Sequence, residues 1–321
     1  MVTESRKIGL RTLPKIELIL WGVALVAICW VYWPALVEMY DRWESDPRYS
    51  HGFLVPVFSL FLLWYRRDLI NVANFQPSWW GFALITLGTG LKMGGGIFFM
   101  GWFDALSLIF MIGGLVLLAG GKAMLRWAWP AVAFLVFMIP LPYKIEYALG
   151  WPLQMIATTA STYALETLGL PAVAEGFTIS MGETKIGVVE ACNGLGMLVM
   201  FFAYATAAVF LIKRPWPDKA VILLSAIPIA LGANIFRITL TGLMHETVGG
   251  EWANKFYHDL AGWLMMPMAL AAFWLELKLL DWLFVEVEPI ASEPKFSFVG
   301  GGSLKAKGVN PVAKPKRDDP S

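Results

Sequence analysis

The sequence predicts an all-α, multi-pass membrane protein with about eight transmembrane helices. Of the 321 residues, 58% are hydrophobic and only 15% are charged, whereas ordinary soluble domains have roughly 45–50% and about 25%. The mean hydropathy is +0.62, and the chain contains 16 Trp and 21 Phe. One soluble core of this size cannot hide so much apolar surface. The composition therefore excludes a soluble enzyme, a disordered chain and a disulfide scaffold.

Net charge and cysteine content narrow the class further. The formal net charge is only +1, which argues against a nucleic-acid binder, because such proteins carry basic patches that neutralise phosphates. We therefore expect no nucleic-acid partner. The two cysteines, Cys29 and Cys192, set no disulfide framework.

Eight apolar runs are the predicted spans, since a spanning helix needs about 20 mostly apolar residues. In chain order they are 16–37, 52–65, 79–100, 103–119, 127–141, 194–212, 220–237 and 256–280. The first run is longer than the apolar core of a signal peptide and has no small-residue cleavage site, so we expect it to be a span. The predicted organisation is a cytoplasmic N-terminus at 1–15, a transmembrane domain at 16–284 and a disordered cytoplasmic tail at 285–321.

The stretch between the fifth and sixth runs contains two further elements. Residues 147–168 are apolar but include several hydroxyl residues and Glu166, which favours an amphipathic or re-entrant segment lying at one membrane face. A ninth span is the alternative, and it would reverse the sidedness of everything after it. Beyond it, we expect a turn at Pro171–Gly176 and a small outer β-hairpin, with strands at 177–180 and 184–189 around Gly182.

The basic residues indicate the orientation. With the N-terminus inside and eight spans, 18 of the 25 Lys and Arg residues fall on the cytoplasmic side. This imbalance agrees with the positive-inside rule, and the pairs Arg66–Arg67 and Lys213–Arg214 carry most of it because they lie in short loops. The polar loop at 38–50 and the long segment at 143–191 are then on the outer side.

A polar helix face around Arg237 is the first candidate for chemistry. Asn234, Arg237 and Thr241 are spaced by three and four residues, so they share one face of a helix. A charge at the centre of a span costs about 2.5–3.5 kcal/mol on insertion scales. Arg237 is therefore either an anion-stabilising group in a wet cavity or a side chain that snorkels to the outer headgroups.

A thiol and two imidazoles fall at the same outer face. Cys192 lies where a strand-like segment meets a helix, and a helix N-terminus lowers the pKa of a cysteine. The alternative interpretation of Cys192 is a small apolar residue that only fills space. We adopt that interpretation for Cys29. His258 opens the last span and His51 the second, although single histidines at span ends are often interfacial. Together the thiol, the imidazole and the cation have the parts for acyl transfer. Paired metal-ligand spacing is lacking, so we expect neither metal nor cofactor.

Several motifs in this order resemble the exosortase/archaeosortase family of membrane cysteine transpeptidases. Tyr49–Pro56 is similar to the family's N-terminal signature, and Ile139–Pro142 with Pro152–Gln154 to its middle region. Glu190–Leu195 is similar to the nucleophile motif, Asn234–Ile238 to the arginine motif and His258–Gly262 to the histidine motif. Two positions depart from the common pattern: Asn193 stands where many members have Ser, and Gly196 where many have a basic residue.

The resemblance implies a membrane-embedded cysteine protease and transpeptidase. Its catalytic residues would be Cys192, Arg237 and His258, with His51, Asn234 and Asn193 in support. The partners implied are exported proteins with a C-terminal sorting signal, often containing Pro-Glu-Pro, together with membrane lipids and a lipid or polysaccharide precursor as acceptor. The implied setting is a bacterial inner membrane, with the site facing outward and a link to exopolysaccharide or biofilm export. The alternative is a polytopic transporter or lipid carrier in which Arg237 is an anion site.

Overall fold

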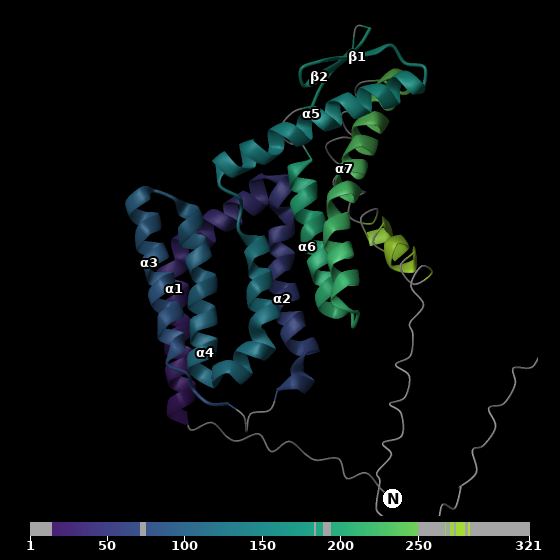
Figure 1. Cartoon of the computed structure of the whole chain (residues 1–321). Coiled ribbons are helices and arrows are strands. Elements are labelled where there is room, and N and C mark those ends of the chain that lie inside the picture. The colour runs from purple at the N-terminus through teal and green to yellow at the C-terminus, as the bar shows by residue number, and fades with distance from the viewer. Residues whose placement is uncertain are drawn as a thin grey trace, which may run out of the picture. The chain divides into compact units, whose positions relative to one another are not determined.

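The fold is seen in a computed structural model, which describes residues 15–70, 75–182, 184–188 and 194–249, and 267, 270–272, 274–279 and 282. Within this part of the chain the structure is mostly helical, with one small antiparallel sheet (Figure 1). Four segments are long and apolar enough to cross a membrane: Gly22–Ser45, Trp80–Phe98, Gly101–Met138 and Trp216–Thr247. The protein is thus a multi-pass helical membrane protein. The number of eight spans stays a prediction, and the span at 256–280 and the tail at 285–321 lie largely outside the described residues.

The first helix is longer than the sequence indicated. α1 (Lys15–Ser45) continues through most of the expected polar loop at 38–50. Its inward-facing positions show why. Ala35 and Met39 are buried and Trp43 is partly buried at helical spacing, and the Trp43 indole Nε1 donates to the Met138 carbonyl at 2.8 Å. A 3-10 helix, η1 (Pro47–Phe53), then leads into α2 (Leu54–Tyr65). With 12 residues, α2 is shorter than the spans named above.

Two of the predicted spans form one interrupted helix. α3 (Trp80–Phe98) matches its prediction and packs along α4 (Gly101–Phe134), which contains the run at 103–119 and most of the run at 127–141. α4 is broken at Gly121, where φ is +64°, a conformation that a side chain would strain. The chain turns back at this break (Figure 1), and the 3-10 helix η4 (Leu135–Met138) follows.

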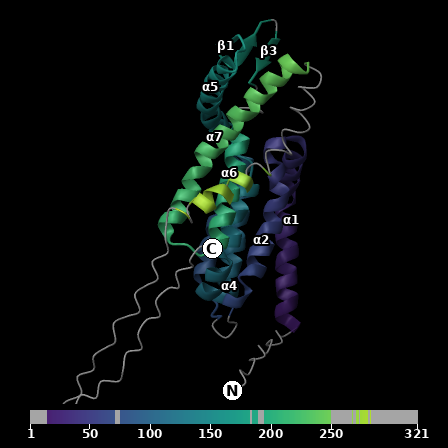
Figure 2. The ribbon, with the colours of Figure 1, turned by 90° about the vertical axis from the view of Figure 1, so that its right-hand side faces the viewer.

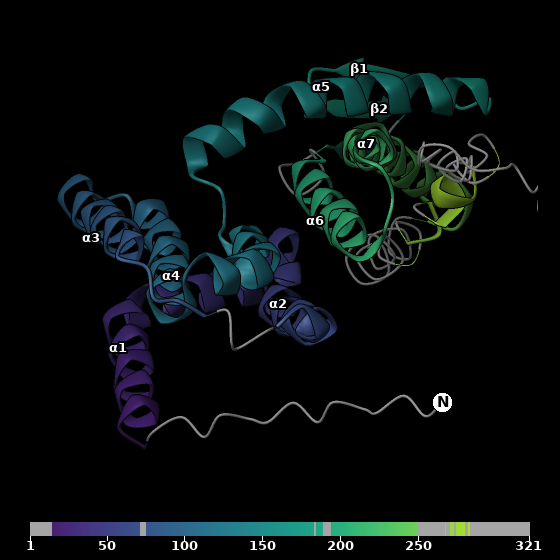
Figure 3. The same ribbon diagram turned by 60° about the horizontal axis from the view of Figure 1, so that its bottom comes forward.

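The segment expected at the membrane face is α5 (Tyr143–Thr167). It crosses the ends of α6 (Leu195–Leu211) and α7 (Trp216–Thr247) at an angle (Figure 1, Figure 3), and it is not among the four candidate spans. In contrast to a soluble amphipathic helix, α5 buries polar side chains and exposes apolar and aromatic ones. Thr158 and Ser161 are fully buried, and Ser161 faces α7, whereas Tyr147 and Tyr163 are mostly exposed.

The segment after α5 has three strands, so the expected turn at Pro171–Gly176 is wrong. Ala172–Glu175 forms β1, which pairs with β2 (Thr178–Met181), and β2 pairs with β3 (Thr184–Gly187), in the order β1-β2-β3. The pairing of Glu175 with Thr178 puts the turn at Gly176 and Phe177 instead. The expected hairpin around Gly182 is present. The sheet lies beside α5 (Figure 2) and shares a small core with α5 and α7.

A pair of opposite charges links two of the helices. Lys92 in α3 forms a salt bridge of 2.5 Å with Asp104 in the first turn of α4, and its ammonium lies 4.5 Å from the ring centroid of Tyr32 in α1. The Tyr32 hydroxyl in turn shares a hydrogen bond of 2.9 Å with Ser107. Pairing reduces the cost of placing such groups among apolar helices, so this cluster ties α1, α3 and α4 together.

Candidate active site around the start of helix α6

Arg237, which the helical spacing places on one face with Asn234, lies near the start of α6. Arg237 and Asn234 share one face of α7, as their spacing indicates, and the Arg237 Nη2 donates to the Asn234 Oδ1 at 2.9 Å. Asn234 is fully buried, and its Nδ2 lies 3.0 Å from where a Cβ on Gly194 would stand. Gly194 has φ +80°, which a glycine adopts without strain. Arg237 is therefore joined through Asn234 to the residue that caps α6.

The other flank of the segment 189–193 is also fixed. Val188 follows β3, is buried, and its backbone N–H donates to the Phe177 carbonyl at 2.7 Å. The Gln154 side chain of α5 donates to the Val188 carbonyl. The residue before this segment, Val188, is therefore held by α5, and the residue after it, Gly194, lies against α7.

The first turn of α6 packs against a third element. A Cβ on Gly196 would stand 2.7 Å from the Cβ of Arg48 in η1, closer than real side-chain contacts. Only glycine therefore permits this approach of α6 to η1. Arg48 lies on one side of the α6 start, and Asn234 with Arg237 lies on the other.

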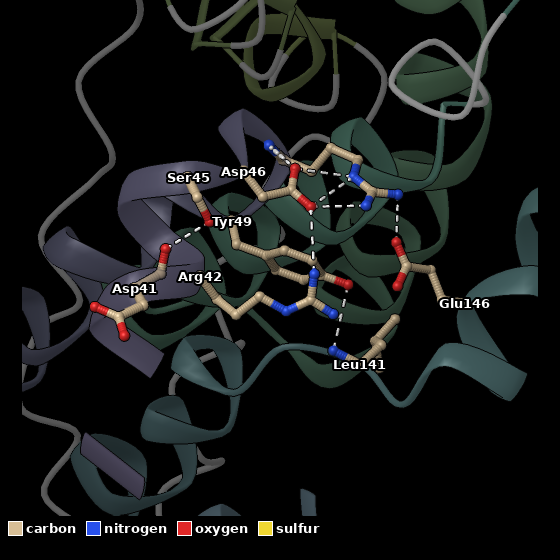
Figure 4. A network of polar contacts seen from close by, with 8 residues as sticks. Asp41, Arg42, Ser45, Asp46, Tyr49, Leu141 and Glu146 are labelled. Atoms are coloured by element: carbon tan, nitrogen blue, oxygen red, sulfur yellow. Dashed lines mark hydrogen bonds and ion pairs between the residues drawn. The ribbon is translucent and has the colours of Figure 1, made fainter. Parts of the chain in front are cut away.

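Charged groups form a network around Arg48, and Figure 4 labels Arg42, Asp46 and Glu146 in it. The Arg48 guanidinium pairs with Asp46 at 2.7 Å and with Glu146 in the first turn of α5, and Arg42 lies 4.0 Å from Asp46. Burial acts to raise the pKa of Asp46, but hydrogen bonds from Arg48 and its charge outweigh it and lower that pKa. The hydrogen bonds to Asp46 likewise raise the pKa of Arg48, so both groups stay ionised.

Two aromatic residues of η1, Tyr49 and His51, are buried next to Arg48 in the sequence. The Tyr49 hydroxyl accepts a hydrogen bond from the Leu141 backbone N–H at 3.3 Å, and burial raises the pKa of Tyr49. The His51 side chain is only 3% exposed, and neither ring nitrogen has a hydrogen bond of ordinary geometry within the described residues. Burial lowers the pKa of His51, while the backbone groups of Phe137 and Arg48 act more weakly in the opposite direction. The imidazole is therefore held neutral inside the protein.

The structure brings some of the predicted site residues together and does not describe others. Asn234 and Arg237 are in contact, and His51 is buried in η1. Cys192, Asn193 and His258 lie outside the described residues, and Cys192 precedes Gly194 by two positions in the sequence. Cys29 is an exposed free cysteine on α1.

The sequence predicts no catalytic or positioning role for three residues at the site. Arg48 and Glu146 belong to none of the motifs, and Gln154 is the last residue of the motif Pro152–Gln154. The sequence does contain a local pattern beside Arg48, because Asp46 followed by Pro47 is typical of the start of a helix. In the structure Asp46 caps η1 and accepts a hydrogen bond from the Arg48 backbone N–H. Among the described residues, no three His, Cys, Asp or Glu side chains are grouped to hold a metal ion.

The fold and this polar cluster define a multi-pass helical membrane protein with charged groups gathered at one end of its helices. The model of the transmembrane exosortase family matches residues 43–275. The match covers most of the chain and includes Cys192, Arg237 and His258, so this protein belongs to the transmembrane exosortase family. Members of this family are membrane cysteine transpeptidases. Comparisons with curated proteins and with solved structures find no match.

Proposed function

We propose that this protein is a cysteine protease and transpeptidase of the inner membrane, and that it cleaves C-terminal sorting signals of exported proteins on the outer side. The observation that carries the proposal is the contact chain from Arg237 through Asn234 to Gly194. Two residues of backbone span at most about 7 Å. A nucleophile at Cys192, two positions before Gly194, is therefore within reach of groups gathered at Gly194.

The proposed first half-reaction forms a thioester. The Cys192 thiolate attacks the scissile carbonyl carbon, and Arg237 stabilises the oxyanion that develops. The C–N bond then breaks, and the leaving amine takes a proton from the His258 imidazolium. The products are a thioester at Cys192 and a released C-terminal fragment that carries the substrate's membrane anchor.

The second half-reaction transfers the acyl group. A hydroxyl or amine of a lipid or polysaccharide precursor attacks the thioester carbonyl and gives its proton to His258, and the C–S bond breaks to restore the thiolate. Asn234, and Asn193 beside the nucleophile, would hold Arg237 and the loop in place. The proposed role includes a link to exopolysaccharide or biofilm export, because a polysaccharide precursor is one of the two acceptors proposed.

Processing of a co-expressed, tagged substrate with a C-terminal sorting signal tests the proposal. Cys192→Ala should leave the substrate at full length, whereas Cys29→Ala should process it normally and serves as the matched control. His258→Ala should slow processing by about 10²–10⁴-fold, and His51→Ala should have a milder effect. Normal processing by Cys192→Ala at equal membrane levels would overturn the proposed function.

A further inference from the structure

The small sheet has an open edge at β3. The Val188 N–H donates to the Phe177 carbonyl at 2.7 Å, and in an antiparallel ladder only every second residue pair exchanges hydrogen bonds. Val188 and Ile186 therefore direct their backbone groups at β2. The N–H and C=O groups of Lys185 and Gly187, the alternate residues in the register, point away from β2 toward the edge.

No described residue pairs with this edge. Within the part of the chain that the structure describes, no backbone hydrogen bond of β3 goes to an element other than β2, and no other element runs along it. Lys185 and Gly187 are both exposed. Because backbone N–H and C=O groups are strong hydrogen-bonding groups, such a row is a template for a further strand.

The side chains of β3 give this edge a chemical preference. Lys185 and Gly187 lie on the exposed face of the sheet, whereas Ile186 packs on the core shared with α5 and α7. None of the salt bridges among the described residues involves Lys185, and a glycine in a strand lets another backbone approach closely. The edge therefore suits an extended peptide with an acidic side chain beside Lys185.

The opposite edge of the sheet, at β1, lacks these properties. By the same alternation, Ala172 and Ala174 direct their backbone groups to that edge. The Ala172 N–H already donates to the Leu170 carbonyl at 2.9 Å. The charged side chain of β1 is that of Glu175, which repels an acidic peptide. The β1 edge is therefore a comparison for the β3 edge within the same molecule.

We propose that the β3 edge binds the extended segment that precedes the substrate's membrane anchor, which adds to the sheet as a fourth strand with an acidic side chain beside Lys185. Main-chain hydrogen bonds then supply affinity, and side chains at alternate positions supply specificity. The inference rests on the proposed function for the identity of the substrate. Cys192 follows Gly187 by five residues, which span at most about 18 Å. A peptide at this edge is therefore near the nucleophile wherever the intervening residues lie.

Charge reversal tests the role of Lys185. A lysine on an edge strand can also act only by discouraging pairing between sheets, and a glutamate would serve that purpose equally well. If Lys185 binds substrate, Lys185→Glu should raise the KM of the full-length enzyme about tenfold for a tagged substrate with one Glu in this segment. Replacing that Glu of the substrate with Lys should reverse the order of the two enzymes. The kcat should stay within about twofold.

A proline substitution tests the main-chain hydrogen bonds. Gly187→Pro removes an N–H that points to the edge and keeps the bonds between β2 and β3, because proline is tolerated where the N–H of an edge strand faces outward. Ala174→Pro makes the same change at the β1 edge and is the matched control. Gly187→Pro should raise KM by about threefold to tenfold, and Ala174→Pro should leave it unchanged.

Disulfide trapping gives a readout that does not require turnover. In the full-length protein with Cys29→Ala and Cys192→Ala, Gly187→Cys is combined with single cysteines placed one by one along the substrate segment, and copper phenanthroline is the oxidant. An added strand predicts disulfides at every second substrate position, because successive side chains of a strand face opposite sides of the sheet. Ala174→Cys, at the other edge, should trap none of these positions.

The outcomes separate this inference from the proposed function. Trapping that is equal at all substrate positions, or equal at the two edges, overturns the added strand. An unchanged KM in Lys185→Glu overturns the acidic preference. If Gly187→Pro does not accumulate in the membrane, the trapping pattern and the charge reversal still decide. Processing that needs Cys192, without trapping at Gly187→Cys, rejects this inference alone, whereas normal processing by Cys192→Ala rejects the proposed function.

Discussion

At the scale of single residues, the contact between Arg237 and Asn234 is the part of the site that the sequence predicted best. Helical spacing alone places the two side chains on one face, and the hydrogen bond of 2.9 Å confirms it. The roles of Arg48, Glu146 and Gln154 were not predictable in this way. Their partners lie far away in the chain, and no local period connects η1 with α6 or α5 with Val188.

Arg237→Lys should lose most of the processing activity although it keeps the positive charge. The guanidinium can bind Asn234 and still present donors to an oxyanion, whereas an ammonium is a compact point charge without a planar set of donors. Losing one oxyanion donor typically costs about 10²–10³ in rate. The measurement is substrate processing at equal membrane levels, with Arg67→Lys as a control, and near-normal processing would reduce Arg237 to a headgroup anchor.

Gly194→Ala should impair activity more than stability. The φ of +80° strains any side chain at this position by about 1–2 kcal/mol, and the added Cβ would press on the Asn234 amide at 3.0 Å. Relief of this contact displaces Asn234 and with it Arg237. Gly90→Ala on α3 is the control, because nothing lies within 4 Å of its added Cβ. Equal activity of the two variants would contradict the contact chain.

His51 should make the stability of the protein depend on pH. Burial lowers its pKa in the folded state, so the unfolded chain binds a proton more readily below about pH 6.5. The contribution of neutral His51 is therefore full above that pH and is lost as the pH falls toward the lowered pKa. Thermal unfolding in detergent should show a midpoint that falls between pH 7.5 and 5.5. His51→Gln should flatten this dependence, and an unchanged slope in His51→Gln would contradict the burial argument.

At the scale of elements, the sequence located the helices well and their ends poorly. Apolar runs predicted α3 and α6 closely, but α1 continues to Ser45 and α7 to Thr247, beyond the predicted ends at 37 and 237. A span predicted from hydropathy ends where charged residues begin, whereas the helix itself continues as long as one of its faces stays buried. The strand at Ala172–Glu175 was missed because Pro171 and Gly176 bound a run too short to show alternation.

The position of α5 sets the sidedness of the site and can be measured in intact cells. Single cysteines at Ser45, Lys185 and Lys213, in a Cys29→Ala, Cys192→Ala background, are treated with an impermeant maleimide. If α5 lies at the outer face, Ser45→Cys and Lys185→Cys should be labelled and Lys213→Cys should be protected. Labelling at 213 together with protection at 185 would mean that α5 spans the membrane.

At the scale of the whole molecule, composition, fold and family agree on one class of protein. The hydrophobic content predicted many spans, the structure has four long apolar segments among its described residues, and the family match runs over 43–275. The structure adds that η1, α5 and α7 converge on the start of α6. This convergence brings residues of η1, α5 and α7, which lie far apart in the chain, to the same end of α6.

The most direct test of the central claim is detection of a thioester on Cys192. The full-length protein is co-expressed with a substrate that carries a C-terminal sorting signal, and the enzyme is analysed by mass spectrometry after rapid acid quenching. We predict an adduct of the N-terminal part of the substrate on Cys192 that hydroxylamine releases, and its absence in Cys192→Ala. Continued processing in Cys192→Ala, with no adduct on the wild-type enzyme, would contradict the account.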